Sequence, residues 1–470
     1  MDEVGGPWRI VIAGAGYAGL RVALRLAAKL DRGRRVALTL VDRHDYHQLL
    51  TEVPRVAGGS RAAGDVRIPL EGVLDERVDF VQATVDGFDF TGRRLLTNAG
   101  PLPYTRLVLA LGSRPNDFGI PGLAERALTL WSVDDARRVL AAVDAQVAAA
   151  VGESDPAEQR RRLTVVIGGA GATGVELAGE LAEELPALAR RHDLPSGWCK
   201  VVLIDASTIL SGSSPELIDR AGRILADLGV EVRTGAKVVR ATETGFILES
   251  GEAIEGGTIV WAGGVKGPDL VAESGLPVGH NGRVKIDRHL RALDHPDIYV
   301  AGDLASVTDP ETGHALPPTA QIALQQGETV ANNLLAEVEG RDLEPFTFLD
   351  KGFVVSIGAR RGVAEVAGRA VEGRLAQVLK KAIEWEYRQS VKHLRGWSPM
   401  AAVVGVPDVQ VSPNDLDGAA VHQGIVGTRS SPHTLVVFST LEPRWSTSCH
   451  TDGTVTRSRA CRMETPIRGA

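Results

Sequence analysis

The chain contains two copies of one glycine-rich pattern, each placed between a short apolar run and a stretch with helical character. The first copy, Gly14-Ala-Gly-Tyr-Ala-Gly19, follows Ile10-Val-Ile-Ala13, and the second, Gly169-Ala-Gly-Ala-Thr-Gly174, follows Thr164-Val-Val-Ile167. In a strand–turn–helix unit, the first glycine allows the tight turn, the second lets the backbone approach a pyrophosphate, and the third lets the helix pack closely on the strand. The anion then lies at the helix N-terminus, where free N–H groups stabilise negative charge. Two copies in one chain therefore predict two dinucleotide sites.

Each copy is followed by a second apolar run that ends in an acid. Val36-Ala-Leu-Thr-Leu-Val-Asp42 follows the first copy, and Lys200-Val-Val-Leu-Ile-Asp205 follows the second. An acid about 20 residues past the glycines binds the ribose hydroxyls of a dinucleotide. The carboxylate of Asp205 would also repel a 2′-phosphate, and the next three residues include no arginine that could bind one. The second site is therefore expected to favour NADH over NADPH.

Length and composition limit the classes of protein to consider. The chain has 470 residues, enough for about two to four domains, and its net charge of −7 argues against a general nucleic-acid-binding role. Its three cysteines, Cys199, Cys449 and Cys461, are too few and too scattered for a disulfide framework. We expect no metal site and no export signal. We also expect no transmembrane helix, because no apolar run reaches ~18 residues.

The repeat extends beyond the glycines and indicates an inserted domain. Thr258–Gly264 in the second unit corresponds to Leu107–Gly112 in the first, and a later strand ends in Gly302-Asp303. The expected fold is α/β, with two Rossmann-like dinucleotide-binding domains of which the second is inserted in the first. The predicted domains are a first dinucleotide-binding domain (1–125 and 296–345), a second one (126–295), a small C-terminal α+β region (346–400) and a poorly ordered tail (401–470).

Several segments outside the repeat have a predicted structure. Helices are expected over 133–151 and over 319–339, the latter because two prolines stand just before it, where a helix tolerates them. The polar stretch 152–162 is interpreted as a surface linker. Alternating apolar residues between 345 and 368 predict a small antiparallel sheet, and residues 374–397 predict a basic amphipathic helix.

On these motifs the chain resembles the type II NADH:quinone oxidoreductases, flavoenzymes of the glutathione-reductase-like superfamily, over about residues 8–400. The most specific likeness is Ala301–Ser306 followed by Leu316–Gly327, with its Ala-Gln-x-Ala-x-Gln pattern. Gly168–Glu180 is similar to the second fingerprint of the family. Tyr46–Gly58 is a third match.

This resemblance implies an FAD-dependent oxidoreductase that passes a hydride from NADH to FAD and then two electrons to a membrane quinone, without proton pumping. Relatives that reduce disulfides carry a redox-active cysteine pair, whereas Cys199 stands alone in the corresponding part of this chain. The resemblance therefore argues against a dithiol relay.

The resemblance also assigns roles to single residues. Glu176 lies near the nicotinamide in the family and could orient it or relay a proton; the simpler alternative is an acid stabilised in the first turn of a helix. Gln321 and Gln325, one helical turn apart, could orient a quinone carbonyl or could face solvent. Asp303 is expected to hydrogen-bond the ribityl chain of the flavin. The residues expected to bind FAD are Gly14, Gly16, Ala18, Gly19, Asp42, Arg43, Val85, Gly112, Gly302, Asp303, Ala320 and Gln321, and those expected to bind NADH are Gly169, Gly171, Thr173, Gly174, Asp205 and Gly263.

A quinone acceptor implies contact with a membrane surface, and the basic helix over 374–397 is the candidate for it. Its aromatic residues Trp385, Tyr387 and Trp397 suit a phospholipid surface, as do its positive residues, which are Lys380, Lys381, Arg388, Lys392 and Arg395. The alternative is a helix docked on the sheet of the enzyme itself or at a homodimer interface. The expected location is cytoplasmic and peripheral, at the inner face of the cell membrane.

Other functions remain open from the sequence. The acceptor could be a ferredoxin or rubredoxin, the quinone could belong to quinone biosynthesis, or the protein could be a flavin-binding redox sensor with little turnover. His44 and His47 follow the first ribose-binding acid and are expected to pack or to face solvent, with catalysis as the alternative. Lys351 is expected to be solvated, with contact to an anionic flavin as the alternative.

Overall fold

The computed structural model describes residues 8–30, 36–308, 313, 315–366 and 368–392. All of these residues belong to one compact unit. The tail predicted over 401–470, and the end of the predicted basic helix with Trp397, lie outside the described residues.

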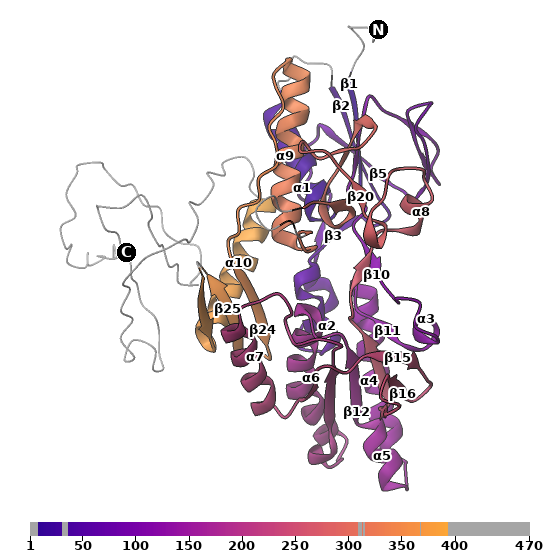
Figure 1. Ribbon diagram of the computed structural model, residues 1–470, viewed down its shortest axis with the longest axis vertical. Coiled ribbons are helices and arrows are strands. Elements are labelled where there is room, and N and C mark those ends of the chain that lie inside the picture. The colour runs from indigo at the N-terminus through magenta and orange to yellow at the C-terminus, as the bar shows by residue number, and fades with distance from the viewer. Residues whose placement is uncertain (1–7, 31–35, 309–312, 314, 367, 393–470) are drawn as a thin grey trace, which may run out of the picture. The chain divides into compact units, whose positions relative to one another are not determined.

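The first sheet has six strands in the order β21-β22-β9-β1-β2-β5. Their bounds are β1 Trp8–Ala13, β2 Val36–Asp42, β5 Val78–Gln82, β9 Arg106–Leu109, β21 Arg291–Ala292 and β22 His295–Val300. All neighbours are parallel except β21, and β22 joins β9 from almost 190 residues further along the chain. The helices α1 (Tyr17–Lys29) and α9 (Ala320–Glu339) lie side by side against this sheet (Figure 1).

The second sheet has five parallel strands in the order β11-β18-β12-β13-β14. Their bounds are β11 Leu128–Thr129, β12 Thr164–Gly168, β13 Lys200–Ile204, β14 Glu231–Arg233 and β18 Thr258–Trp261. Every residue of β12 is buried, as expected for a parallel strand covered on both faces. The covering helices include α4 (Val133–Val151), α6 (Ala172–Arg191) and α7 (Pro215–Asp227). In the order of the chain, the strands of this sheet come after β9 and before β22 of the first sheet. The expected α/β fold with an inserted Rossmann-like unit is therefore confirmed.

Two short antiparallel strands, β10 (Arg114–Pro115) and β19 (Val265–Lys266), carry the chain out of the first unit and back. After β19, Val271, Leu276 and Val284 pack in the same core as the first sheet. This packing favours a domain boundary near β19 over the predicted one at 295.

Smaller elements are β3 Tyr46–Gln48, β4 Arg67–Pro69, β6 Val85–Asp89, β7 Arg94–Thr97, β8 Leu102–Pro103, β15 Val238–Ala241, β16 Gly245–Leu248, β17 Ala253–Glu255, β20 Val284–Lys285, β23 Ala305–Ser306, α2 Val53–Ala57, α3 Leu123–Arg126 and α8 Asp269–Ala272.

The described C-terminal part is an antiparallel sheet of β24 (Phe353–Ile357), β25 (Arg361–Val366) and β26 (Arg369–Glu372), followed by α10 (Arg374–Lys392). The helix packs on β24 and β25, while β24 packs on α6 (Figure 1). The predicted small sheet is confirmed here.

The surface linker predicted over 152–162 contains a helix, α5 (Pro156–Arg162), that the sequence did not suggest; none of the residues of this helix is buried, so the segment lies at the surface as predicted. Its N-cap, Asp155, accepts a hydrogen bond from the N–H of Ala157, and Pro156 occupies the first turn. The residue before a proline disfavours helix, but proline itself suits the first turn, so a helix can begin there.

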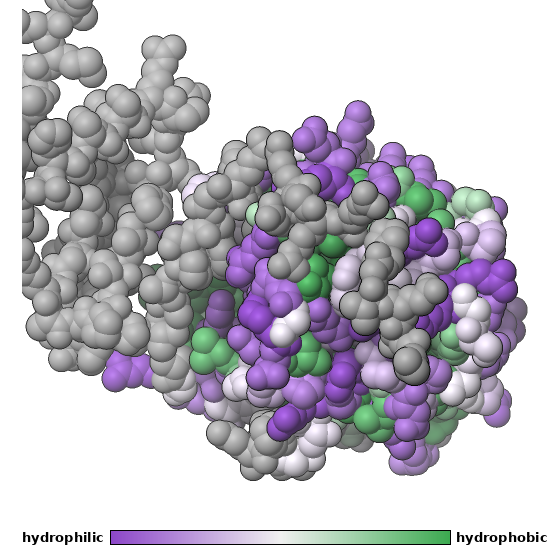
Figure 2. Space-filling model, turned by 90° about the horizontal axis from the view of Figure 1, so that it is seen from above, coloured by the Kyte–Doolittle hydropathy of each residue, from purple (hydrophilic) through white to green (hydrophobic). Residues whose placement is uncertain are grey.

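The face of the molecule seen in Figure 2 is mainly hydrophilic, with hydrophobic residues in small separate groups. In the part of the chain that the structure describes, no helix is long and apolar enough to cross a membrane.

Candidate dinucleotide and electron-transfer site

The first glycine motif forms a tight turn between β1 and α1. Gly14 has φ +106°, a conformation that favours glycine, and a Cβ there would overlap the carbonyl oxygen of Ala110. A Cβ on Gly19 would overlap the carbonyl oxygen of Gly14, which shows how closely helix and strand pack. A Cβ on Gly16, by contrast, would meet no described atom within 4 Å. The space in front of α1 is therefore open where a pyrophosphate would approach.

The second motif repeats this geometry between β12 and α6. Gly169 has φ +102°, and a Cβ on Gly174 would overlap the Gly169 carbonyl oxygen. A Cβ on Gly171 would again find no described atom within 4 Å. Each motif thus combines a glycine-dependent turn with open space at a helix N-terminus, and both fit a dinucleotide.

The two acids brace these turns, a role that the sequence did not suggest. Oδ2 of Asp42 accepts a hydrogen bond from the N–H of Ala15 at 2.7 Å, and Oδ2 of Asp205 accepts one from the N–H of Ala170 at 2.7 Å. A carboxylate oxygen can accept a further hydrogen bond, so both acids can still bind a ribose hydroxyl. The repeated contact shows that the two units are built alike.

Asp303 lies at the end of the first sheet, just after β22, and its side chain and main chain are both hydrogen-bonded. Its carboxylate accepts a hydrogen bond from Ser113 Oγ at 2.8 Å, and burial raises the pKa of this carboxyl. The guanidinium of Arg283 donates to the carbonyls of Asp303 and Ala305, at 2.8 and 2.6 Å. Arg283 therefore fixes the segment that carries the predicted flavin-binding acid, and no motif in the sequence indicated it.

Gln321 and Gln325 lie on one face of α9, as predicted, but both side chains are already paired. Gln321 Oε1 accepts from the N–H of Lys351 at 2.9 Å. Gln325 donates to the carbonyl of Leu349 and accepts from its N–H, both at 2.9 Å. The two amides thus fasten residues 349–351 along α9. The next residue, Gln326, also accepts a hydrogen bond from the N–H of Gly302 at 2.6 Å and was missed from the sequence.

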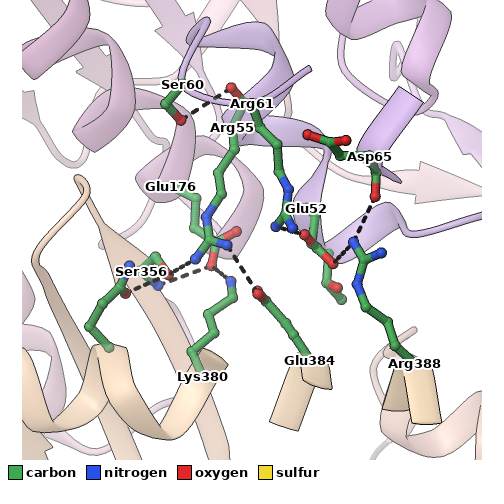
Figure 3. Close-up of polar contacts among 12 residues, drawn as sticks. Glu52, Arg55, Ser60, Arg61, Asp65, Glu176, Ser356, Lys380, Glu384 and Arg388 are labelled. Carbon is green, nitrogen blue, oxygen red and sulfur yellow. Dashed lines mark hydrogen bonds and ion pairs between the residues drawn. The ribbon is translucent and has the colours of Figure 1, made fainter. Parts of the chain in front are cut away.

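Glu176 is buried in the second turn of α6, so the alternative of a first-turn acid does not hold, and it has partners from the C-terminal region (Figure 3). Its Oε1 accepts a hydrogen bond from the N–H of Ser356 at 3.0 Å and forms an ion pair with Lys380 of α10. The assignment of Lys380 to a lipid-facing basic set is therefore wrong, since this residue is 5% exposed. Arg388 also points inward and pairs with Glu52 at 2.9 Å.

The histidines after Asp42 have packing roles. His47 is buried; Nδ1 lies 2.9 Å from the carbonyl of Ala15, and Nε2 lies 2.8 Å from the hydroxyl of Tyr387. The Tyr387 ring packs on Tyr17, with centroids 4.9 Å apart. Tyr387 is thus partly buried, with its ring and hydroxyl turned toward the protein, which does not fit the prediction that placed it at a lipid surface. His44 stacks on Tyr46, with centroids 4.9 Å apart.

The remaining predicted ligands lie on several elements of the two units. Ala18 is buried in α1, Thr173 lies in the first turn of α6, and Ala320 begins α9 after the N-cap Thr319. Arg43 is exposed after β2, and Val85 begins β6. Gly112 and Gly263 lie in the loops that follow β9 and β18, and Gly302 begins a short 3-10 helix (Gly302–Leu304) after β22.

Comparison with known proteins agrees with this architecture. Residues 8–327 match the family model of pyridine nucleotide-disulphide oxidoreductases. The chain is 33% identical to a type II NADH:quinone oxidoreductase of Staphylococcus saprophyticus over 80% of this chain and 94% of that protein. It is 34% identical to the one of Staphylococcus aureus over the same shares. The chain belongs to the type II NADH:quinone oxidoreductases.

As a type II NADH:quinone oxidoreductase, the chain is a flavoprotein oxidoreductase that uses FAD and NADH, which accords with its two dinucleotide cradles. The fold is shared with the structure of NDH2 from Plasmodium falciparum in complex with NADH. That structure superposes with a TM-score of 0.73 at 17% identity, over 81% of this chain and 95% of the other.

Proposed function

We propose that this chain oxidises NADH at the second glycine motif and reduces a membrane quinone through FAD held at the first. The observation that supports this most strongly is the pair of equivalent cradles in one compact unit, each open at Gly16 or Gly171 and each braced by an acid. When bound, FAD accepts a hydride from NADH and delivers two electrons to the quinone.

The residues of the chain supply binding, orientation and charge. Gly16 and Asp42 would hold the pyrophosphate and ribose of FAD, while Gly171 and Asp205 would do the same for NADH. Asp303, fixed through Ser113, would bind the ribityl chain. Oδ1 of Asp205 accepts a hydrogen bond from the N–H of Ser207 and can accept another from a ribose 2′-hydroxyl, whereas the carboxylate would repel a 2′-phosphate. Preference for NADH over NADPH is therefore part of the proposal.

Glu176 is proposed to orient the nicotinamide or to hold a proton, with Lys380 as its ion-pair partner. A buried carboxylate that has both a cation and a main-chain N–H keeps one orientation without a substrate. Gln321 and Gln325 are proposed to contact the quinone carbonyl. They would have to exchange their present bonds to residues 349–351 for that contact, so the quinone would enter beside this segment.

Membrane contact is proposed for the outer face of α10. Leu375, Val378, Ile383 and Trp385 are 59, 58, 47 and 54% exposed, whereas the charged residues Lys380 and Arg388 point inward. An exposed helix face that combines these apolar residues with the exposed cations Arg374 and Lys381 suits the boundary between lipid headgroups and acyl chains. The proposed location is peripheral, at the inner face of the cell membrane. Covering of the same face in a homodimer is the alternative.

The test is anaerobic stopped-flow absorbance of the FAD-loaded protein, mixed first with NADH and then with a short-chain quinone. Fast bleaching by NADH and fast reoxidation by quinone are expected. Fast bleaching with slow reoxidation would contradict the quinone as acceptor and direct the search to iron–sulfur proteins. Absence of bleaching would leave a flavin-binding protein without NADH oxidation. In the same assay, Glu176→Gln is expected to slow one of the two steps at least about tenfold, the loss of about 1.4 kcal/mol of stabilisation.

A further inference from the structure

The segment 46–58 carries a largely buried arginine at the junction of three parts of the molecule. Arg55 lies on α2, and its Nη1 donates to Glu384 Oε2 of α10 at 3.0 Å. Its Nη2 donates to Ser356 Oγ of β24 at 3.3 Å. Its Nε lies 4.0 Å from Glu180 Oε1 of α6. One guanidinium thus contacts the C-terminal helix and the C-terminal sheet (Figure 3) as well as helix α6 of the inserted unit.

Ser356 connects this guanidinium to Glu176. The Ser356 hydroxyl accepts from Arg55 and donates to Gln377 Oε1 at 2.9 Å, so its rotamer is determined from two sides. The N–H of the same serine donates to Glu176 Oε1 at 3.0 Å. Arg55 and the Glu176 carboxylate are therefore linked through a single residue, Ser356, whose hydroxyl binds Arg55 and whose N–H binds Glu176.

The charges along α10 alternate and match the surface beneath them. Lys380, Glu384 and Arg388 follow one another at intervals of four residues, so they lie on one face of the helix. Their partners are Glu176, Arg55 and Glu52. A shift of the helix by one turn would bring like charges together, so this alternation defines a single register, with Arg55 at its centre.

Arg55 also balances the charge around Glu176. Among the described residues, this cluster contains the carboxylates of Glu176, Glu180 and Glu384 and the cations Arg55 and Lys380. Burial raises the pKa of Glu180, whose Oε2 also accepts a hydrogen bond from Ser60. Without Arg55, one lysine would face three carboxyl groups, and Lys380 would be drawn between Glu176 and the freed Glu384.

We propose that Arg55 is a positioning residue for the Glu176–Lys380 pair. By binding both Glu384 and Ser356, Arg55 fixes the register of α10, which carries Lys380, and the position of the Ser356 N–H on β24. Both of these groups contact the Glu176 carboxylate. This inference rests on the proposed role of Glu176. It predicts that Arg55 acts through Glu176 and has no independent effect on electron transfer.

The experiment is a double-mutant cycle on the full-length, FAD-loaded protein. Arg55→Met is introduced with and without Glu176→Gln, and both steps are measured by stopped-flow. Alone, Arg55→Met is expected to slow the Glu176-dependent step about tenfold. In the Glu176→Gln background, it is expected to cause no further loss, because the carboxylate that it positions is already gone.

Two further variants separate positioning from general loss of structure. Arg388→Met removes the other inward arginine of the α10 contact, but Glu52 keeps its second partner, Arg61. It is expected to lower the thermal midpoint without slowing the Glu176-dependent step. Arg55→Lys keeps the charge and is expected to recover part of the rate, and it replaces Arg55→Met in the cycle if that variant does not fold.

The outcomes distinguish this inference from the proposed function. An equal loss from Arg55→Met in both backgrounds, or the same rate loss from Arg388→Met, would show that Arg55 is only structural. A strong effect of Glu176→Gln with none from Arg55→Met would overturn this inference alone. Unchanged kinetics for Glu176→Gln would overturn the role of Glu176 and this inference with it.

Discussion

Two pairs of glycines differ in what surrounds them. A Cβ on Gly16 or Gly171 would lie in open space among the described atoms, whereas one on Gly14 or Gly169 would overlap main-chain atoms. Gly16→Val is therefore expected to leave the fold intact and to fill the space proposed for the FAD pyrophosphate. FAD affinity should fall at least about tenfold, or about 1.4 kcal/mol, when measured by flavin fluorescence.

The matched variant Gly171→Val is expected to retain FAD and to raise the KM for NADH by a similar factor. Gly14→Ala is the structural control and should lower the thermal midpoint, because it places a side chain at φ +106° against Ala110. A protein with Gly16→Val that binds FAD normally would show that the pyrophosphate does not approach this turn.

His47 connects the pH dependence of stability to the first motif. Burial lowers its pKa to about 4 from 6.5. As the pH falls through this interval, the unfolded chain takes up a proton that the folded protein does not, so stability present above pH 6.5 is lost. The shift corresponds to about 3 kcal/mol. Urea unfolding at pH 7 and 4.5 should show a smaller pH dependence for His47→Gln than for the unaltered protein.

The control for this prediction is Tyr387→Phe, which removes the hydroxyl beside His47 Nε2 but leaves the imidazole covered. It is expected to lower stability by about 1 kcal/mol at both pH values and to retain the pH dependence. An unchanged pH dependence in His47→Gln would assign the acid sensitivity to the carboxylates.

At the scale of single helices and strands, the sequence predicted correctly the features that neighbouring residues in the chain determine. The helix at 133–151 and the start of α9 were predicted correctly, because N-cap residues and prolines mark helix ends in the sequence itself. The roles of Lys380 and Tyr387 were not, since each meets its partner across more than 200 residues. A basic, amphipathic pattern indicates that a helix has a polar and an apolar face, but it does not indicate which of the two faces packs on the rest of the protein.

The outer face of α10 gives the prediction at this scale. The triple variant Leu375→Ser, Val378→Ser and Ile383→Ser is expected to reduce co-sedimentation with phospholipid vesicles at least about tenfold. The thermal midpoint should change little, because all three side chains are largely exposed. Ser substitutions at Val151 and Val239, which are exposed on other elements, are the control.

Equal vesicle binding by the triple variant and the control would contradict membrane contact through this face. If the triple variant instead converts a dimer to a monomer without lipid, as measured by analytical ultracentrifugation, a second copy of the chain covers α10.

At the scale of the whole molecule, the two dinucleotide units share a core. Buried residues of the first sheet, such as Leu40, belong to the same continuous cluster as Leu203 of the second sheet and Val355 of the C-terminal sheet. The sequence predicted two units with their own glycine motifs, but it could not show that α2 and α4 join their interiors. Units that share buried surface should unfold together.

We therefore expect one calorimetric transition for residues 8–392 of the FAD-loaded protein. Leu40→Ala and Leu203→Ala each remove a fully buried side chain and should cost about 3 kcal/mol. If the core is shared, both variants shift the same transition, and FAD is released in it whichever unit carries the substitution. If Leu203→Ala instead produces an early transition while flavin stays bound, the inserted unit unfolds on its own. The shared core would then serve to align the two dinucleotides and would not couple their stability.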